Sequence, residues 1–229
     1  MSSTIERPLG LTEILAEAVR LYGNRFAAAI GLGLPTGAAF LATLATPLAL
    51  DIVVLSIAFT GSYAAAARLT AGDPFWEAWA QAGLRAPVLA VLAVVVAVPF
   101  SLALSQLFLL VFAVAWLALV GFSIPVAVLE RDPEARNWFD HLSFALYRST
   151  SLARAEYLHA AGIVAALVII EIVVGIPLAA ALSGFAENGR EAALVLTQVV
   201  LAPFFFLGLS VLYFEQKARA LSSPREQRT

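Results

Sequence analysis

Long apolar stretches alternate with short charged segments along the whole chain. A membrane-spanning helix needs about 20 consecutive apolar residues, and several charge-free runs reach that length. The run from Ala86 to Leu129 has 44 residues without a charged side chain, which exceeds one span, so we expect a turn near Ser101–Gln106. The pattern predicts six transmembrane helices, at about residues 26–50, 52–69, 86–104, 107–129, 157–182 and 192–214.

Amphipathic segments precede the first, third and fifth predicted spans. Their apolar side chains recur at helical spacing on one face, while charged side chains occupy the other. They are too polar to span a membrane, so we expect helices that lie in the interface or pack on the bundle. Asp-Pro pairs open the second and third segments, as suits helix starts. The predicted interfacial helices cover residues 8–22, 74–84 and 133–150.

The order amphipathic helix, arginine, apolar span, proline occurs three times, over Leu11–Pro35, Phe75–Pro99 and Trp138–Pro177. Repeats of this kind often place a binding site at the interface between them. The sequence therefore predicts an all-α, polytopic membrane bundle of three hairpins, each preceded by an interfacial helix. We expect a single membrane domain over residues 1–229 and a polar, frayed tail after Phe214.

Composition agrees with lipid as the solvent. Hydrophobic residues make up 61% of the chain and charged residues 13%, against about 45–50% and 25% in soluble domains. The absence of cysteine excludes disulfides and thiolate chemistry. A net charge of −2 gives no overall attraction to nucleic acid, so we expect no nucleic-acid partner. The first ten residues lack the pattern of a cleaved signal peptide.

Basic residues predict the orientation. With six spans, 13 of the 14 lysines and arginines fall on one side, together with both termini, and Arg190 alone falls on the other. Cytoplasmic loops carry such an excess of positive charge. We therefore expect both termini in the cytoplasm.

Three segments resemble one protein family. They are LTEILAEAVRLYGNRF, IPVAVLERD with the following FALYRSTSLARAEYLHAAG, and LSVLYFEQKAR. The chain resembles the six-helix membrane-domain family that is sometimes fused to glycerophosphodiester phosphodiesterases and otherwise found as stand-alone bacterial proteins. The resemblance implies a bacterial cytoplasmic membrane protein tied to envelope or lipid homeostasis. The fused enzymes carry catalysis in a separate soluble barrel, so no phosphodiesterase activity is expected here.

Glu171 is the most informative single residue, because it falls midway along the fifth predicted span. An ionised carboxylate at that depth costs at least about 2.5 kcal/mol, so it should be protonated, paired or hydrated. Gln198, Thr60 and Tyr63 in other spans are candidate partners, and a backbone carbonyl group is another. Glu171 is then either a neutral contact between helices or a proton- or substrate-linked group.

Four basic side chains near the predicted cytoplasmic face form a second candidate site. Such residues either bind anionic lipid headgroups or anchor the protein by charge alone. They are Arg148, Arg154, His141 and His159.

No reaction centre is evident. Asp140 and His141 with Glu130 and Asp132 match no metal-ligand spacing, and GFSIP lacks the second glycine of a nucleophile elbow. We expect no catalytic residue, metal or cofactor. The sequence favours a non-enzymatic accessory or scaffold protein that binds membrane lipids or a partner membrane protein. The alternative is a small transporter or lipid-handling permease that uses Glu171.

Overall fold

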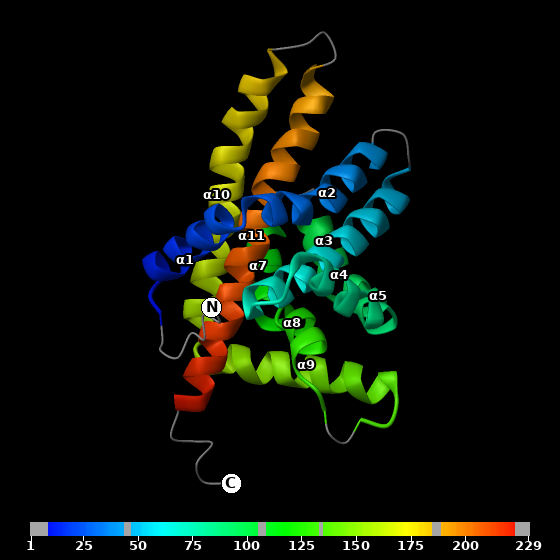
Figure 1. Cartoon of the computed structure of the whole chain (residues 1–229), viewed down its shortest axis with the longest axis vertical. Helices are drawn as coiled ribbons and strands as arrows, with labels where there is room; N and C mark the ends of the chain where they lie inside the picture. The colour runs from blue at the N-terminus through cyan, green and yellow to red at the C-terminus, as the bar shows by residue number, and fades with distance from the viewer. Residues whose placement is uncertain (1–8, 44–46, 105–108, 133–134, 185–188, 223–229) are drawn as a thin grey trace.

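The protein is an all-helical bundle, as the apolar pattern predicts. A computed structural model describes residues 9–43, 47–104, 109–132, 135–184 and 189–222, and the regular elements in these ranges are all helices (Figure 1). In chain order they are α1 (Leu11–Asn24), α2 (Phe26–Thr43), α3 (Leu48–Ala71), α4 (Phe75–Leu84), α5 (Ala86–Leu92), the π-helical turn η1 (Ala93–Ala97), α6 (Val98–Leu104), α7 (Leu110–Val120), α8 (Ser123–Leu129), α9 (Trp138–Ala155), α10 (Tyr157–Ser183) and α11 (Gly189–Ser222).

The helices are those of a multi-pass membrane protein. Within the described ranges, four segments are long and apolar enough to cross a membrane alone: Leu50–Ala71, Leu110–Leu129, Tyr157–Ser183 and Glu191–Ser222. The count rises to six if α1 with α2, and α4 with α5 and α6, each form one bent span. Neighbouring helices pair as the hairpin prediction requires, since α2 packs on α3, α6 on α7, and α10 on α11.

Sharp bends separate two of the amphipathic helices from the apolar helices that follow. The helix axis turns by 99° between α1 and α2 and by 80° between α4 and α5. Arg25 stands at the first corner and Arg85 at the second. The guanidinium group of Arg25 donates to the carbonyl oxygens of Leu69 and Asp73, at 2.9 and 3.2 Å, which ties the corner to the end of α3. In Figure 1, α9 likewise runs across the lower end of α10.

Several helix starts differ from the predicted ones, since α1 begins at Leu11 instead of at residue 8 and α11 at Gly189 instead of at 192. α3 begins at Leu48 instead of at 52, so Asp51 lies in its first turn. The third amphipathic helix begins at Trp138. Asn137 caps it, because its side-chain oxygen accepts hydrogen bonds from the backbone N–H groups of Phe139 and Asp140. The expected turn near Ser101–Gln106 falls partly outside the described residues, since α6 continues to Leu104 and 105–108 are not described.

The C-terminal end corrects part of another prediction, because residues 215–222 continue α11 to Ser222 and are not frayed. The rest of the predicted tail, 223–229, lies outside the described residues. Glu215 and Gln216 are fully buried. Arg219, one helical turn after Glu215, forms an ion pair with its carboxylate. A buried charge needs a charged or hydrogen-bonding partner, and the tertiary contacts of α11 with α1 and α9 supply the enclosure.

The π-helical turn η1 has an identifiable cause in Pro99. Proline has no backbone N–H, so the carbonyl oxygen of Val95, four residues earlier, lacks its helical donor. The indole Nε1 of Trp116 on α7 donates to this oxygen at 3.0 Å. Because lipid offers no donor to a freed carbonyl group, this contact fixes α7 against η1.

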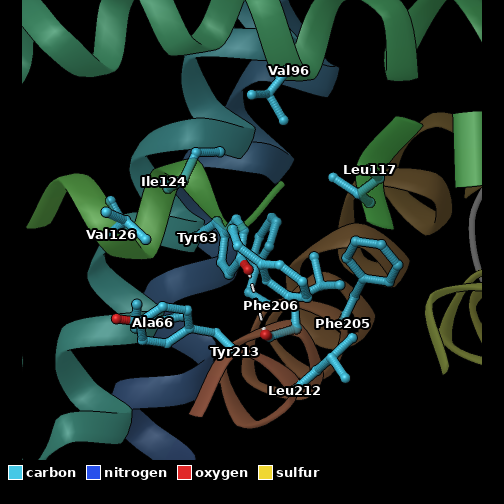
Figure 2. Packing of buried hydrophobic residues seen from close by; sticks show 14 of the residues in the cluster. Tyr63, Ala66, Val96, Leu117, Ile124, Val126, Phe205, Phe206, Leu212 and Tyr213 are labelled. Atoms are coloured by element: carbon cyan, nitrogen blue, oxygen red, sulfur yellow. Dashed lines mark hydrogen bonds between the residues drawn. The ribbon is translucent and has the colours of Figure 1, made fainter. Parts of the chain in front are cut away.

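The core of the bundle gathers around α3 and α11 (Figure 2). The alanines from Ala64 to Ala67 are all fully buried, so other parts of the bundle pack on every side of α3 at this level. Tyr63 on α3 stacks on Phe206 of α11, with ring centroids 6.5 Å apart, and its hydroxyl donates to the carbonyl oxygen of Leu209 at 3.4 Å. In lipid, where apolar burial gives little driving force, such packing and hydrogen bonding hold helices together.

Candidate functional site

A cavity of about 370 Å³ lies between α2, α3, α6, α10 and α11. We call it the bundle cavity. Ligand sites in proteins are typically apolar hollows of about 300–1,000 Å³ with a few convergent polar groups. The bundle cavity has this character, because most of its wall is aliphatic or aromatic. Its aromatic side chains are Phe40, Phe59, Phe100, Phe205 and Phe206.

Glu171 and Gln198 both line the bundle cavity. The α10–α11 hairpin brings them together, since Glu171 lies on α10 and Gln198 on α11. Residues three or four apart share a helix face, and Val168 and Ala202 accordingly line the cavity beside them. The structure thus places the two predicted intramembrane polar residues at one site.

The side chains of Glu171 and Gln198 remain available for hydrogen bonding to a ligand. In the described part of the chain, neither Glu171 nor Gln198 has a hydrogen bond or an ion pair. Thr36, a third polar residue of the wall, donates its hydroxyl to the carbonyl oxygen of Gly33 at 2.7 Å. The carboxyl of Glu171 and the amide of Gln198 are therefore the hydrogen-bonding groups that the cavity offers.

The other predicted partners of Glu171 lie elsewhere. Thr60 and Tyr63 do not line the bundle cavity, and the hydroxyl of Tyr63 bonds to α11 in the core. Glu171 follows Tyr157, the first residue of α10, by 14 positions, which is about 21 Å along the helix axis. This distance puts the carboxyl deep within the apolar length of α10.

A polar cluster surrounds Glu130, the residue that follows α8. The Glu130 cluster joins α8, α9 and α11. Glu130 Oε1 accepts from the Tyr213 hydroxyl at 2.7 Å and lies 2.9 Å from Lys217 Nζ, while Arg148 Nε lies 3.4 Å from Oε2. Burial raises the pKa of Glu130, but the bonds from Lys217 and Tyr213 and the charges of Lys217 and Arg148 outweigh burial and hold the pKa below its ordinary value.

Arg219 makes a second set of contacts near the end of α11. Its guanidinium group pairs with the carboxylates of Glu215 and Glu156. It also donates to the carbonyl oxygen of Leu9 at 3.1 Å and lies 3.2 Å from His159 Nε2. This one side chain therefore ties α11 to α10 and to the segment ahead of α1.

The four residues predicted to bind headgroups have different surroundings. Arg148 belongs to the Glu130 cluster, and His159 lies beside Arg219. His141 is buried, with Nε2 3.0 Å from the carbonyl oxygen of Ala127. Arg154 is exposed near the end of α9. Two of the four are thus engaged with carboxylate or arginine neighbours, and headgroup binding by the set stays a prediction.

Sequence reasoning missed the Glu130 cluster as a unit. Tyr213 and Lys217 are one helical turn apart, which is a usable signal for a shared face. Glu130, however, lies 83 residues before Tyr213, and no local pattern links the two. Among the described residues, no group of three His, Cys, Asp or Glu side chains is placed to hold a metal ion.

Comparison of the chain with protein-family models, curated proteins and solved structures found no match. The family resemblance of the three segments therefore stays a prediction.

Proposed function

We propose that this integral membrane protein binds a lipid-like amphiphile in the bundle cavity and acts as a binding protein, not as an enzyme. The observation that carries the proposal is the pairing of an apolar wall with Glu171 and Gln198. A ligand with an apolar body and one hydrogen-bonding group fits such a wall. Its apolar part contacts the phenylalanine rings, and its polar group reaches the carboxyl or the amide.

Lipid is the favoured source of the ligand because of where the cavity lies. A carboxyl group deep in a bilayer is costly unless it is neutral or finds a partner, and a hydrogen-bonding ligand supplies one. The groups of the cavity support the proposed role in binding. One carboxyl, one amide and a threonine hydroxyl already bonded to Gly33 offer no activated nucleophile.

The proposal places the protein in a bacterial cytoplasmic membrane with both termini in the cytoplasm, in accord with the distribution of its basic residues. Within that membrane it serves as an accessory protein of lipid or envelope homeostasis.

The test is to fill the cavity and measure co-purified lipid. Ala202 is 5% exposed and lines the cavity, so Ala202→Phe should occupy the space. We expect native mass spectrometry of the gently extracted variant to show loss of a lipid that the wild type retains. Ala180→Phe makes the same change at an exposed position of α10 and should keep the lipid. Equal retention by a folded Ala202→Phe protein would refute the proposal.

Transport is the second candidate function, favoured by the position of Glu171 at a cavity instead of in a packed contact. Glu171→Gln keeps hydrogen bonding but removes the ionisable group. A binding protein should retain its lipid in this variant, whereas a proton-linked transporter should retain binding and lose flux in reconstituted vesicles. Wild-type flux in Glu171→Gln would remove the residue-level support for transport.

A further inference from the structure

A second cavity, of about 430 Å³, lies where the bend between α4 and α5 meets the segment that leads into α9. We call it the basic cavity. It is separate from the bundle cavity, and the two share no lining residue. The side chains that matter for its chemistry are Leu84, Arg85, Arg131, Asp132, Arg136 and Trp138.

Positive charge prevails in the basic cavity, because three arginines line it against one aspartate. In the part of the chain that the structure describes, Arg85, Arg131 and Arg136 form no ion pair with a carboxylate. Arg68, Arg148 and Arg219, by contrast, each pair with one. Three unneutralised guanidinium groups around one hollow create a potential that attracts an anion.

Guanidinium groups favour phosphate in particular. Their planar array of N–H donors matches two oxygens of a phosphate at once. A single carboxylate ligand would occupy the donors of one guanidinium group, whereas three arginines around a cavity suit the several oxygens of a phosphate group.

Two large apolar side chains that line the basic cavity are exposed. Leu84 is 74% exposed and Trp138 is 49% exposed. Tryptophan is enriched at the level of lipid headgroups. Basic cavities at this level bind anionic headgroups, and an adjoining leucine and indole ring provide contact for the glycerol and upper acyl carbons.

The walls of the basic cavity are held by hydrogen bonds within the protein. His141, a buried lining residue, lies with Nε2 3.0 Å from the carbonyl oxygen of Ala127. The backbone N–H of Arg136 donates to Asp140 Oδ2 at 3.0 Å, and Asn137 caps α9. The segment that carries Arg136 is thereby fixed against the start of α9, which lowers the cost of ordering it on binding.

From this geometry we propose that the basic cavity binds the phosphate of an anionic phospholipid headgroup, with Arg85, Arg131 and Arg136 as its ligands. The proposal does not depend on the bundle cavity. It also assigns headgroup binding to arginines other than Arg148 and Arg154.

The test compares two lipids with identical acyl chains in native mass spectrometry of the full-length protein. We expect the wild type to retain phosphatidylglycerol in preference to phosphatidylcholine. The variant Arg85→Gln/Arg136→Gln should bind phosphatidylglycerol at least about tenfold more weakly, with binding of phosphatidylcholine unchanged. Arg20→Gln removes a charge from a side chain that is 57% exposed on α1, outside the cavity, and should keep the preference. Added salt should weaken the wild-type preference.

Two further measurements keep the result decisive. Arg131→Gln alters an exposed side chain outside the helices, so the variant should fold even if the double variant does not. It should also weaken phosphatidylglycerol binding, and this gives a second test of the proposal. Retention of the full preference in folded Arg131→Gln and Arg85→Gln/Arg136→Gln proteins would overturn the proposal. Glycerol 3-phosphate, offered without lipid, tests a soluble source. Binding of this compound as tight as that of phosphatidylglycerol, and lost in the same variants, would overturn the assignment to lipid.

Discussion

Gly33 on α2 faces the backbone carbonyl oxygen of Val199 on α11, and a Cβ atom at Gly33 would overlap that oxygen. Pro203, four residues after Val199, has no N–H to donate to the same carbonyl group. Gly37, one turn after Gly33, also packs against Val199. This small-residue pair lets two backbones approach closely, as in helix pairs that associate in lipid.

Gly33→Ala should therefore destabilise the bundle. The added methyl group meets backbone, which cannot rotate away, so α2 must shift from α11 at a cost of about 1–3 kcal/mol. Thermal unfolding in mild detergent, followed by circular dichroism, measures the effect. Gly162→Ala is the control, because the new Cβ meets nothing within 4 Å beyond the adjacent residues and the nearby backbone of its own helix, and alanine favours a helix. Unfolding temperatures that do not differ between the two variants would contradict the close packing.

Removal of the aromatic contact at Phe206 should also destabilise the core. Phe206 is 1% exposed and packs edge-to-face on Phe59, with centroids 5.2 Å apart. Phe206→Ala leaves a void that costs roughly 2 kcal/mol or more. Phe112→Ala removes an equal ring from a side chain that is 70% exposed and should change the stability of the purified protein little. The same detergent unfolding assay compares them, and a larger loss at Phe112 would refute the assigned core.

Glu130 should make stability depend on acidity in a defined direction. Its pKa is lowered in the folded protein. Its contribution to the free energy of unfolding is therefore complete above the unfolded-state pKa of about 4.3. This contribution is lost as the pH falls through the lower folded-state pKa. Wild type should be more stable than Glu130→Gln at neutral pH, and the gap should narrow below about pH 4.3. Unfolding temperatures between pH 7 and pH 3 test this.

Glu77→Gln serves as the control for that series. Glu77 is exposed on α4, so its variant should run parallel to the wild type across the same pH range. A gap between wild type and Glu130→Gln that widens in acid would contradict the role assigned to the cluster.

Arg219→Met should be strongly destabilising. It leaves the fully buried carboxylate of Glu215 without its arginine partner, with the Gln216 amide at 3.1 Å and His159 Nε2 at 3.7 Å as its remaining neighbours. Breaking a buried ion pair by removing one partner costs up to roughly 3–5 kcal/mol. The double variant Glu215→Gln/Arg219→Met should recover part of the loss, because the stranded charge is gone. Arg154→Met, at an exposed position, is the control. Equal stability of the single and double variants would show that Arg219 acts through packing alone.

Membrane character, the amphipathic helices and several helix boundaries were predictable, because each depends on a local property. The length of an apolar run decides whether it can span lipid, and the charged face of residues 11–24 favours an interfacial position for that helix. Arg25 and Arg85 mark corners for the same reason, since a charge cannot continue into lipid at low cost. Glu171 could be singled out because a carboxyl in an apolar run has no local partner.

Only the tertiary structure decided where the polar groups meet. Residues of five helices form the bundle cavity, so its existence depends on how the hairpins pack and on the shapes of phenylalanines far apart in sequence. Arg85 lines the same cavity as Arg131 and Arg136 only because the bend after α4 lies against the segment that leads into α9. The C-terminal turns of α11 look like a solvated tail in sequence, yet they are helical because Glu215 and Arg219 pair inside contacts with the segment ahead of α1 and with α10. The stability of a polar segment depends on partners that are distant in the chain, and local patterns carry no record of them.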